Sequence, residues 1–185
     1  MARTPSNMLP LGTTAPEFSL RDTVSNKAMS FNDIKGSHGT VVFFICNHCP
    51  FVIHVNDTLV ALANEFSSKG IRFVGVSSND VENYPQDGPA EMKAHAAAAG
   101  YPFPYLYDET QEVAKAYDAA CTPDIYLFDN AQKLVYRGQL DDSRPGNHIP
   151  SDGSDLKAAI SALLKQEPPL NIQKPSIGCN IKWKS

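Results

Sequence analysis

The sequence offers little that would tie the protein to a membrane or to a nucleic acid. Its 185 residues contain no run of about 18 apolar residues, the length that a membrane-spanning helix requires. Lys and Arg number 16 against 20 Asp and Glu, so the net charge is -4 and no broad basic surface is expected. Residues 1–8 lack the continuous apolar core of a signal peptide. We therefore expect a cytoplasmic protein that binds neither membranes nor nucleic acid.

Cysteine is also scarce. Four cysteines are too few for a small secreted scaffold built on disulfides, and in a reducing compartment cysteines are more often catalytic or metal-binding. No second Cys-x-x-Cys and no His-x-x-His accompany Cys46 and Cys49, which argues against a structural zinc site. With 42% hydrophobic residues, the chain can bury a full core without such links. We expect a single domain over 1–185, with a core at about 12–165 and a tail at 166–185.

Hydrophobic patterning divides the chain into short strands and helices. Apolar runs at 40–45 and 71–77 are typical of strands covered on both faces, and the apolar spacing between them predicts a helix over 50–69. Strand, helix and strand in this order predict a right-handed parallel crossover. Further strands are expected at 18–20, 28–31, 124–129 and 133–137, and further helices at 89–99, 110–117 and 154–165. The first two of these strands would form an N-terminal hairpin.

The tail is rich in proline and cannot form one helix. It nevertheless carries four large apolar residues, which predict that it packs back onto the core: Ile172, Ile177, Ile181 and Trp183.

The segment Cys46-Asn47-His48-Cys49-Pro50 stands where the strand at 40–45 turns into the helix. Unpaired backbone N–H groups and the helix dipole favour an anion at such a place, so the pKa of Cys46 is expected to be lowered and Cys46 to be the nucleophile. Cys49 would resolve the mixed disulfide, and a donor from His48 would stabilise the thiolate. Pro50 suits the first helical turn, where its missing N–H costs nothing.

Four segments spread over the chain resemble a known family. They are 12–20, 43–50, Cys121-Thr122-Pro123-Asp124 and 178–183. Together they are similar to the thioredoxin superfamily, and within it to the peroxiredoxin-like branch of the AhpC/TSA type that carries a Cys-x-x-Cys motif. The resemblance implies an α/β, thioredoxin-like fold: a central mixed β-sheet flanked by helices, with an N-terminal β-hairpin extension and a docked C-terminal tail. It also implies that Thr122-Pro123 is a cis-proline site facing the dithiol, where Thr122 offers backbone contacts to an extended substrate.

Departures from the family pattern bear on the activity. Typical peroxiredoxins carry a threonine three residues before the reactive cysteine and an arginine before the strand at 124–129. Here Phe43 precedes Cys46 by three, and Pro123 takes the approximate place of the arginine. Peroxide reduction needs donors that stabilise the departing hydroxide, so these changes weigh against a dedicated peroxidase. Thr40 and Ile45 stand where thioredoxin has a buried aspartate and a tryptophan.

The sequence therefore predicts a thiol–disulfide oxidoreductase that uses a Cys46/Cys49 dithiol–disulfide switch and needs no cofactor. One alternative is a thiol peroxidase that reduces hydroperoxides. Another is a metal carrier that binds copper or zinc through Cys46, Cys49, His48 and Cys121. Cys121 and Cys179 are candidates for extra redox thiols, and the alternative for both is that they pack as small hydrophobic residues. The expected partners are a disulfide-containing protein or small thiol substrate, a thioredoxin- or glutathione-type electron donor, and a second copy of the chain in a homodimer.

Overall fold

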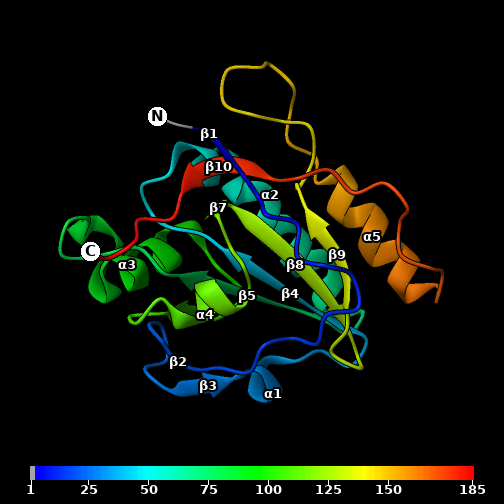
Figure 1. The fold of residues 1–185 in the computed structure, drawn as a ribbon, viewed down its shortest axis with the longest axis horizontal. Helices are drawn as coiled ribbons and strands as arrows, with labels where there is room; N and C mark the ends of the chain where they lie inside the picture. Colours follow the sequence, from blue (N-terminus) through cyan, green and yellow to red (C-terminus); the bar gives the residue numbers. More distant parts are fainter. Residues whose placement is uncertain (1–2) are drawn as a thin grey trace.

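The fold is built on a seven-stranded mixed sheet, described here from a computed structural model that covers residues 3–185. At its centre, β4 (Gly39–Phe44) pairs in parallel with β5 (Ile71–Ser77) and antiparallel with β8 (Asp124–Asp129). The strand order is β3-β2-β6-β5-β4-β8-β9, as Figure 1 shows. The outer strands are β2 (Ser19–Asp22), β3 (Ala28–Ser30), β6 (Tyr105–Tyr107) and β9 (Leu134–Gly138).

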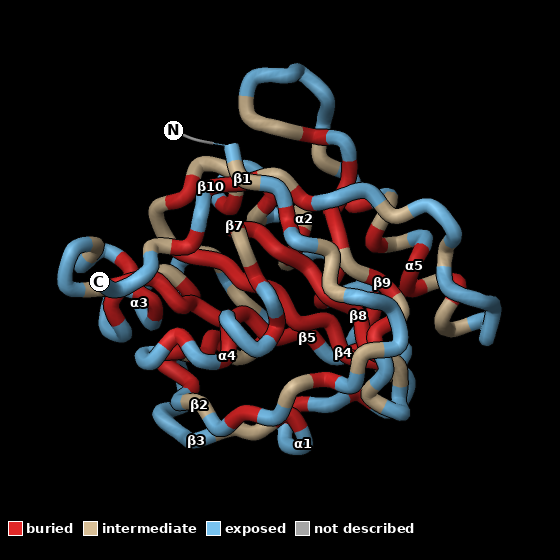
Figure 2. Tube along the Cα trace, viewed as in Figure 1, coloured by how far each residue is buried: buried red, intermediate tan, exposed pale blue. Residues whose placement is uncertain are grey.

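Helices cover both faces of the sheet because successive side chains of a strand point to opposite sides. Val41 and Phe43 of β4 pack in one core with α2 (Pro50–Ser67), α3 (Pro89–Ala99) and α5 (Ser154–Leu164). Val42 and Phe44 pack in a second core with α1 (Phe31–Ile34) and α4 (Glu112–Ala116). Burial on both faces explains why β4 is apolar at nearly every position, and Figure 2 shows β4, β5 and β8 as the buried centre of the molecule.

A second, small sheet lies beside the carboxyl end of β4. It consists of β1 (Arg3–Pro5), β10 (Ile177–Asn180) and β7 (Cys121–Thr122), paired antiparallel in the order β1-β10-β7. Figure 1 shows β10 lying next to β1, above the start of β8. The first and the last strand of the chain are thus neighbours in one sheet.

Most expected elements are confirmed. Helix α3 has the expected bounds, α2 ends at Ser67 rather than at residue 69, and the N-terminal hairpin is β2–β3. The tail docks as expected through Ile181, which is 1% exposed, but Ile172 is 82% and Trp183 42% exposed. Apolar residues in the tail were therefore only partly a guide to packing.

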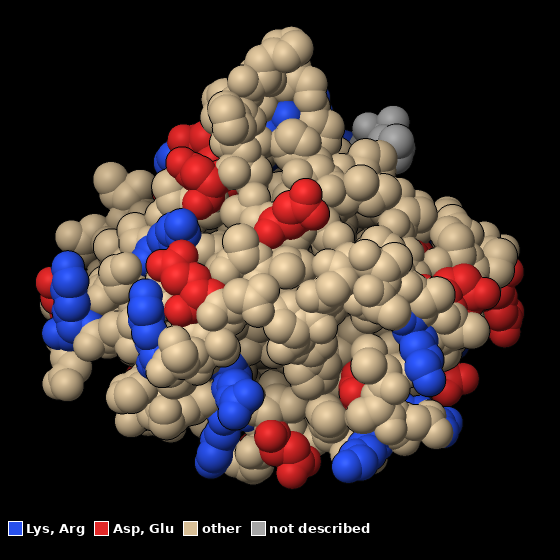
Figure 3. Space-filling model, turned by 180° about the vertical axis from the view of Figure 1, so that it is seen from behind, with Lys and Arg blue, Asp and Glu red and all other residues tan. Residues whose placement is uncertain are grey.

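The hydropathy of the helices and the distribution of surface charge are separate features of the molecule. Within residues 3–185, no helix is both long and apolar enough to cross a membrane. On the face seen in Figure 3, basic and acidic side chains alternate around the rim, and neither sign gathers into a broad patch.

Candidate redox site

The dithiol lies at the carboxyl end of β4, in the segment that leads into α2. Cys49 is the N-cap residue of α2 and Pro50 opens the helix, so the proline lies in the first turn as expected. Cys46 lies before the helix, in the segment that follows β4. Both thiols are buried: Cys46 is 2% and Cys49 0% exposed.

The loop before β8 closes over the two sulfurs. Because β4 and β8 pair with Phe44 opposite Asp124, the residues just before Asp124 reach the dithiol. The Thr122-Pro123 peptide bond is cis, as the resemblance implied. Thr122 Oγ1 lies 3.6 Å from Cys46 Sγ, and the thiol form of Cys49 donates to the Thr122 carbonyl oxygen at 3.2 Å.

The negative charge of the reduced pair is favoured on Cys49. The S–H of Cys46 is hydrogen-bonded to the Cys49 sulfur, and this contact, together with donors from Cys179 and Thr122, lowers the pKa of Cys49 despite its burial. The same contact raises the pKa of Cys46, and burial and the carboxylate of Asp87 raise it further. The proximity of the two cysteines is thus the largest cause of both pKa shifts.

The expectation of a lowered pKa at Cys46 was thus wrong. It assumed that Cys46 lies at the helix N-terminus, whereas α2 begins at Pro50 and the capping position belongs to Cys49. Backbone N–H groups of a first turn act over a short range, so they favour an anion at Cys49 rather than three residues earlier. The sequence pattern predicted the position of the dithiol, but not the contacts with Cys46, Cys49 and Asp87 that shift the pKa values of the two thiols.

Asn47 and His48 are held by a buried carboxylate that sequence reasoning missed. Asp87, in the 3-10 helix η1 (Pro85–Asp87), is 0% exposed and accepts hydrogen bonds from the Asn47 backbone N–H at 2.8 Å and from Asn79 Nδ2 at 2.8 Å. His48 Nδ1 lies 2.7 Å from Asp87 Oδ2, and its ring stacks on Tyr84 at 5.5 Å between centroids. His48 therefore binds Asp87 through Nδ1, where we had expected it to donate to Cys46.

No sequence motif links Asp87 to the dithiol, because nearly forty residues separate them and they meet only through tertiary contacts such as the hydrogen bond from the Asn47 backbone N–H. Tyr105 of β6 completes this shell, since its hydroxyl donates to Asn47 Oδ1 at 3.1 Å. These contacts fix the backbone between the two cysteines.

The other two cysteines lie beside the dithiol. Cys121 is 0% exposed, its Sγ lies 3.6 Å from the Pro123 carbonyl oxygen, and burial raises its pKa. Cys179, on β10, is 4% exposed and is hydrogen-bonded to Cys49. Burial is the main cause of its raised pKa, and the contact with Cys49 adds to it. None of the four cysteines forms a disulfide in this structure.

One set of side chains at the site could hold a metal ion. Cys46, His48 and Asp87 each place one donor atom within 4.8 Å of the others. Thiolate, imidazole and carboxylate together suit zinc. This set differs from the one expected from the sequence, because Asp87 takes the place of Cys49 and Cys121.

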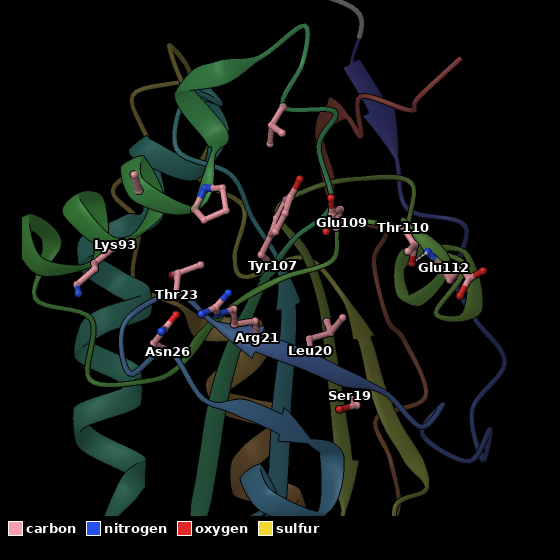
Figure 4. A pocket seen from close by; sticks show the side chains of 13 residues that line it. Ser19, Leu20, Arg21, Thr23, Asn26, Lys93, Tyr107, Glu109, Thr110 and Glu112 are labelled. Atoms are coloured by element: carbon pink, nitrogen blue, oxygen red, sulfur yellow. Dashed lines mark hydrogen bonds between the residues drawn. The ribbon is translucent and has the colours of Figure 1, made fainter.

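A cavity of about 1010 Å³ lies elsewhere, between the β2–β3 hairpin, β6 and α3 (Figure 4). Its lining carries both signs of charge, with Arg21 and Lys93 opposite Glu109 and Glu112. It shares no lining residue with the dithiol and its immediate contacts.

The architecture places the chain in a class: a mixed sheet flanked by helices, with a Cys-x-x-Cys at the end of a central strand and a facing cis-proline, is a thioredoxin-like redoxin. The model of the AhpC/TSA family matches residues 11–137, and the chain belongs to that family. A comparison with curated proteins found no match.

Solved structures agree with this fold. An uncharacterized conserved protein from Geobacillus kaustophilus is 58% identical with a TM-score of 0.98, over 100% of this chain and 97% of that one. The thioredoxin domain of a thiol-disulfide oxidoreductase from Bacteroides vulgatus is 22% identical with a TM-score of 0.61, over 81% and 97%. Peroxidoxin BcpB from Mycobacterium tuberculosis is 18% identical with a TM-score of 0.62, over 84% and 96%.

Proposed function

We propose that this protein is a thiol–disulfide oxidoreductase in which Cys46 and Cys49 interconvert between a dithiol and a disulfide. The observation that carries the proposal is that both sulfurs contact Thr122, the residue before the cis Pro123: Cys46 Sγ lies 3.6 Å from its Oγ1 and Cys49 Sγ 3.2 Å from its carbonyl oxygen. A thiolate held at a helix N-terminus next to a second thiol is the arrangement that disulfide exchange requires.

In the direction of substrate reduction, the Cys49 thiolate attacks one sulfur of a substrate disulfide. A mixed disulfide forms and the other substrate sulfur leaves as a thiolate. Cys46 then loses its proton and attacks Cys49, so that the Cys46–Cys49 disulfide forms and the second substrate thiolate departs. Two electrons pass to the substrate, and the reverse sequence oxidises a dithiol. This order exchanges the roles expected from the sequence, because the charge is favoured on Cys49.

The proposed partners follow from this chemistry. The substrate is a disulfide-containing protein or a small disulfide. Electrons come from a thioredoxin- or glutathione-type donor, in a cytoplasmic setting where such donors are abundant. Thr122 and Pro123 are proposed to bind the substrate, since Thr122 lies against both sulfurs. Self-association into a homodimer is tested by light scattering of the reduced protein.

The test is the reduction potential of the Cys46–Cys49 pair, measured in glutathione buffers with thiol trapping and mass spectrometry. Stabilising the Cys49 thiolate stabilises the reduced state, so we expect a potential above the value of about -270 mV found for thioredoxin, toward about -180 mV. Cys46→Ser and Cys49→Ser should abolish the transition, and Cys121→Ser serves as the matched control. Absence of a Cys46–Cys49 disulfide at every buffer ratio would refute the proposal.

The order of attack has its own test. In Cys46→Ser/Cys179→Ser, neither neighbour can displace a mixed disulfide from Cys49, so a glutathione adduct should accumulate on Cys49 after addition of glutathione disulfide. If Cys46 attacks first instead, the adduct will accumulate on Cys46 in Cys49→Ser.

A thiol peroxidase is the second candidate, favoured by the same buried thiolate at the start of α2. Attack of Cys49 on a hydroperoxide would give a sulfenic acid and an alcohol, and condensation with the Cys46 thiol would release water and form the disulfide. Peroxide consumption that is lost in Cys49→Ser would support it.

The third alternative is a metal carrier without turnover, with Cys46, His48 and Asp87 as the donor set. It is tested by measuring the metal content of the freshly purified protein and of Asp87→Asn. Bound metal that is lost in the variant would support it.

A further inference from the structure

The C-terminal strand lies on the edge of the chain that an extended substrate would use. β10 pairs antiparallel with β7, with Cys179 opposite Thr122 and Asn180 opposite Cys121. Thr122 is the residue before the cis proline and touches both active-site sulfurs. An incoming peptide that adds a strand to this edge would meet the same backbone groups. The edge is therefore already occupied by the protein itself.

The register of this pairing brings a tail sulfur to the dithiol. Cys179 is hydrogen-bonded to Cys49, the sulfur on which the negative charge is favoured. Cys49 therefore has two thiol neighbours, Cys46 and Cys179. A substrate cysteine awaiting attack would need to lie where Cys179 lies.

The residue before Cys179 permits this close approach. A Cβ atom added to Gly178 would overlap the carbonyl oxygen of Thr122 and crowd the Thr122–Pro123 peptide. Only glycine lets β10 lie this near the cis-proline segment. The absence of a side chain at Gly178 thus allows the tail to pack against the cis-proline segment.

Hydrogen bonds hold the strand at both of its ends. On one side, Ser176 Oγ donates to the Pro123 carbonyl oxygen, and the Ser176 backbone exchanges hydrogen bonds with Ser6. On the other side, the Lys182 backbone N–H donates to Asn79 Oδ1 at 2.9 Å, and Gln111 Nε2 donates to the Lys182 carbonyl at 2.8 Å. The strand is held in place independently of its contact with β7.

We infer that β10 occupies the peptide-binding edge of β7 as an internal substrate, and that Cys179 exchanges disulfides with Cys49. The inference rests on the proposed function, because the Cys46–Cys49 disulfide is what Cys179 would act upon. External substrates then reach the dithiol only when β10 is displaced from β7.

The exchange needs no added oxidant or reductant. The Cys179 thiolate attacks the Cys49 sulfur of the Cys46–Cys49 disulfide. The Cys49–Cys179 bond forms, the Cys46–Cys49 bond breaks, and Cys46 leaves as a thiolate that takes up the proton lost by Cys179. The disulfide is thereby transferred to Cys49 and Cys179, and Cys46 returns to its thiol form.

The first test maps disulfides in the full chain after treatment with glutathione disulfide, acid quenching, alkylation and peptic digestion. Wild type should give both Cys46–Cys49 and Cys49–Cys179 peptides. In Cys46→Ser, glutathione disulfide first caps Cys49, and Cys179 then displaces glutathione, so the Cys49–Cys179 peptide should be the main product. Cys121→Ser, which removes the other buried neighbour, should leave the wild-type pattern.

The outcomes separate the two proposals. A Cys46–Cys49 disulfide in Cys179→Ser, with no Cys49–Cys179 peptide in wild type or Cys46→Ser, would overturn the role of Cys179 and leave the proposed function standing. If Cys179→Ser forms no Cys46–Cys49 disulfide, the proposed function fails and the exchange fails with it.

The second test displaces the strand. Gly178→Ala should lift β10 from Thr122, so Cys49 should react with iodoacetamide at least about tenfold faster than in wild type, which corresponds to about 1.4 kcal/mol. Amide exchange of residues 177–180 should speed up in parallel. Asn180→Ala, on the same strand but with an exposed side chain, is the control and should leave both rates unchanged. An unchanged Cys49 rate in Gly178→Ala would show that β10 does not block access.

Discussion

Asp87 shows how one buried carboxylate shapes the chemistry of a neighbouring thiol. Its charge contributes to the raised pKa of Cys46, while its oxygens fix Asn47 and His48. A single side chain thus contributes both to the electrostatics of Cys46 and to the backbone geometry between the cysteines.

Replacing Asp87 with Asn should lower the pKa of Cys46, because the repulsive charge is removed while the volume is kept. The amide group of the new Asn has only one acceptor oxygen, so it cannot accept all the hydrogen bonds that the Asp87 carboxylate accepts. The variant should therefore lose about 1–3 kcal/mol of stability. The pH profile of Cys46 alkylation and urea unfolding measure the two effects. Tyr105→Phe removes a hydroxyl from the same shell but no charge, and should leave the pH profile of Cys46 alkylation unchanged. A wild-type profile in Asp87→Asn would contradict the electrostatic account.

Asp124 gives the protein a pH-dependent stability. Burial raises its pKa from 3.8 to about 7. Between these values the folded state keeps a proton that the unfolded chain releases, so this contribution is present below about pH 4 and is lost as the pH rises through 7, at up to about 1.4 kcal/mol per unit. Asp124→Asn should therefore gain stability over wild type as the pH rises from 4 to 8. Urea unfolding across this range measures the difference, with Asp129→Asn on the same strand as control; a difference independent of pH would argue against the assignment.

At the scale of the element, β10 depends on contacts outside its own four residues. Ser176→Ala removes the hydroxyl that donates to the buried Pro123 carbonyl oxygen. An unsatisfied buried acceptor costs about 1–3 kcal/mol, and we expect this cost to appear mainly as faster amide exchange in β10. Exchange in β4 reports on global unfolding and is the internal reference. Equal acceleration in both strands would mean that the tail does not open separately.

The elements that the sequence predicted well are those whose own pattern determines them. The apolar run of β4 and the 3.6-residue spacing of α2 are local signals, and both appear in the fold within a few residues of the expected bounds. β7 has two residues and β10 has four, and both take their strand form from pairing with distant segments: β7 with β10, and β10 also with β1. A pattern that depends on a distant partner leaves little trace in a short window.

In the site, too, the features set by local sequence were predicted and those set by distant contacts were not. The motif predicted the dithiol, and the resemblance predicted the cis proline at Thr122-Pro123. The raised pKa of Cys46 could not be predicted, because it arises from the contact with Cys49, from burial and from the carboxylate of Asp87, which is distant in the sequence. Residue type shows which atoms can react, and tertiary contacts decide which of them carries the charge.

At the scale of the whole molecule, oxidation state and stability are linked. The Cys49 thiolate accepts hydrogen bonds from Cys46 and Cys179, and a Cys46–Cys49 disulfide would lose both. We therefore expect the reduced protein to melt at a higher temperature than the oxidised protein, by about 2–4 °C for each kcal/mol at this chain length. Thermal unfolding with and without reductant measures the difference, and Cys46→Ser/Cys49→Ser should show none. A higher melting temperature for the oxidised protein would indicate a structural disulfide instead.

The small sheet β1-β10-β7 also affects the order in which the protein becomes functional during synthesis. Contacts between residues far apart in the sequence form late in folding, and β10 leaves the ribosome long after Cys49. Until then, the nascent chain carries Cys46 and Cys49 without their cover. Newly made protein would thus pass through an interval in which its thiols are open to any oxidant or metal ion in the cell, and maturation ends when the last strand closes over them.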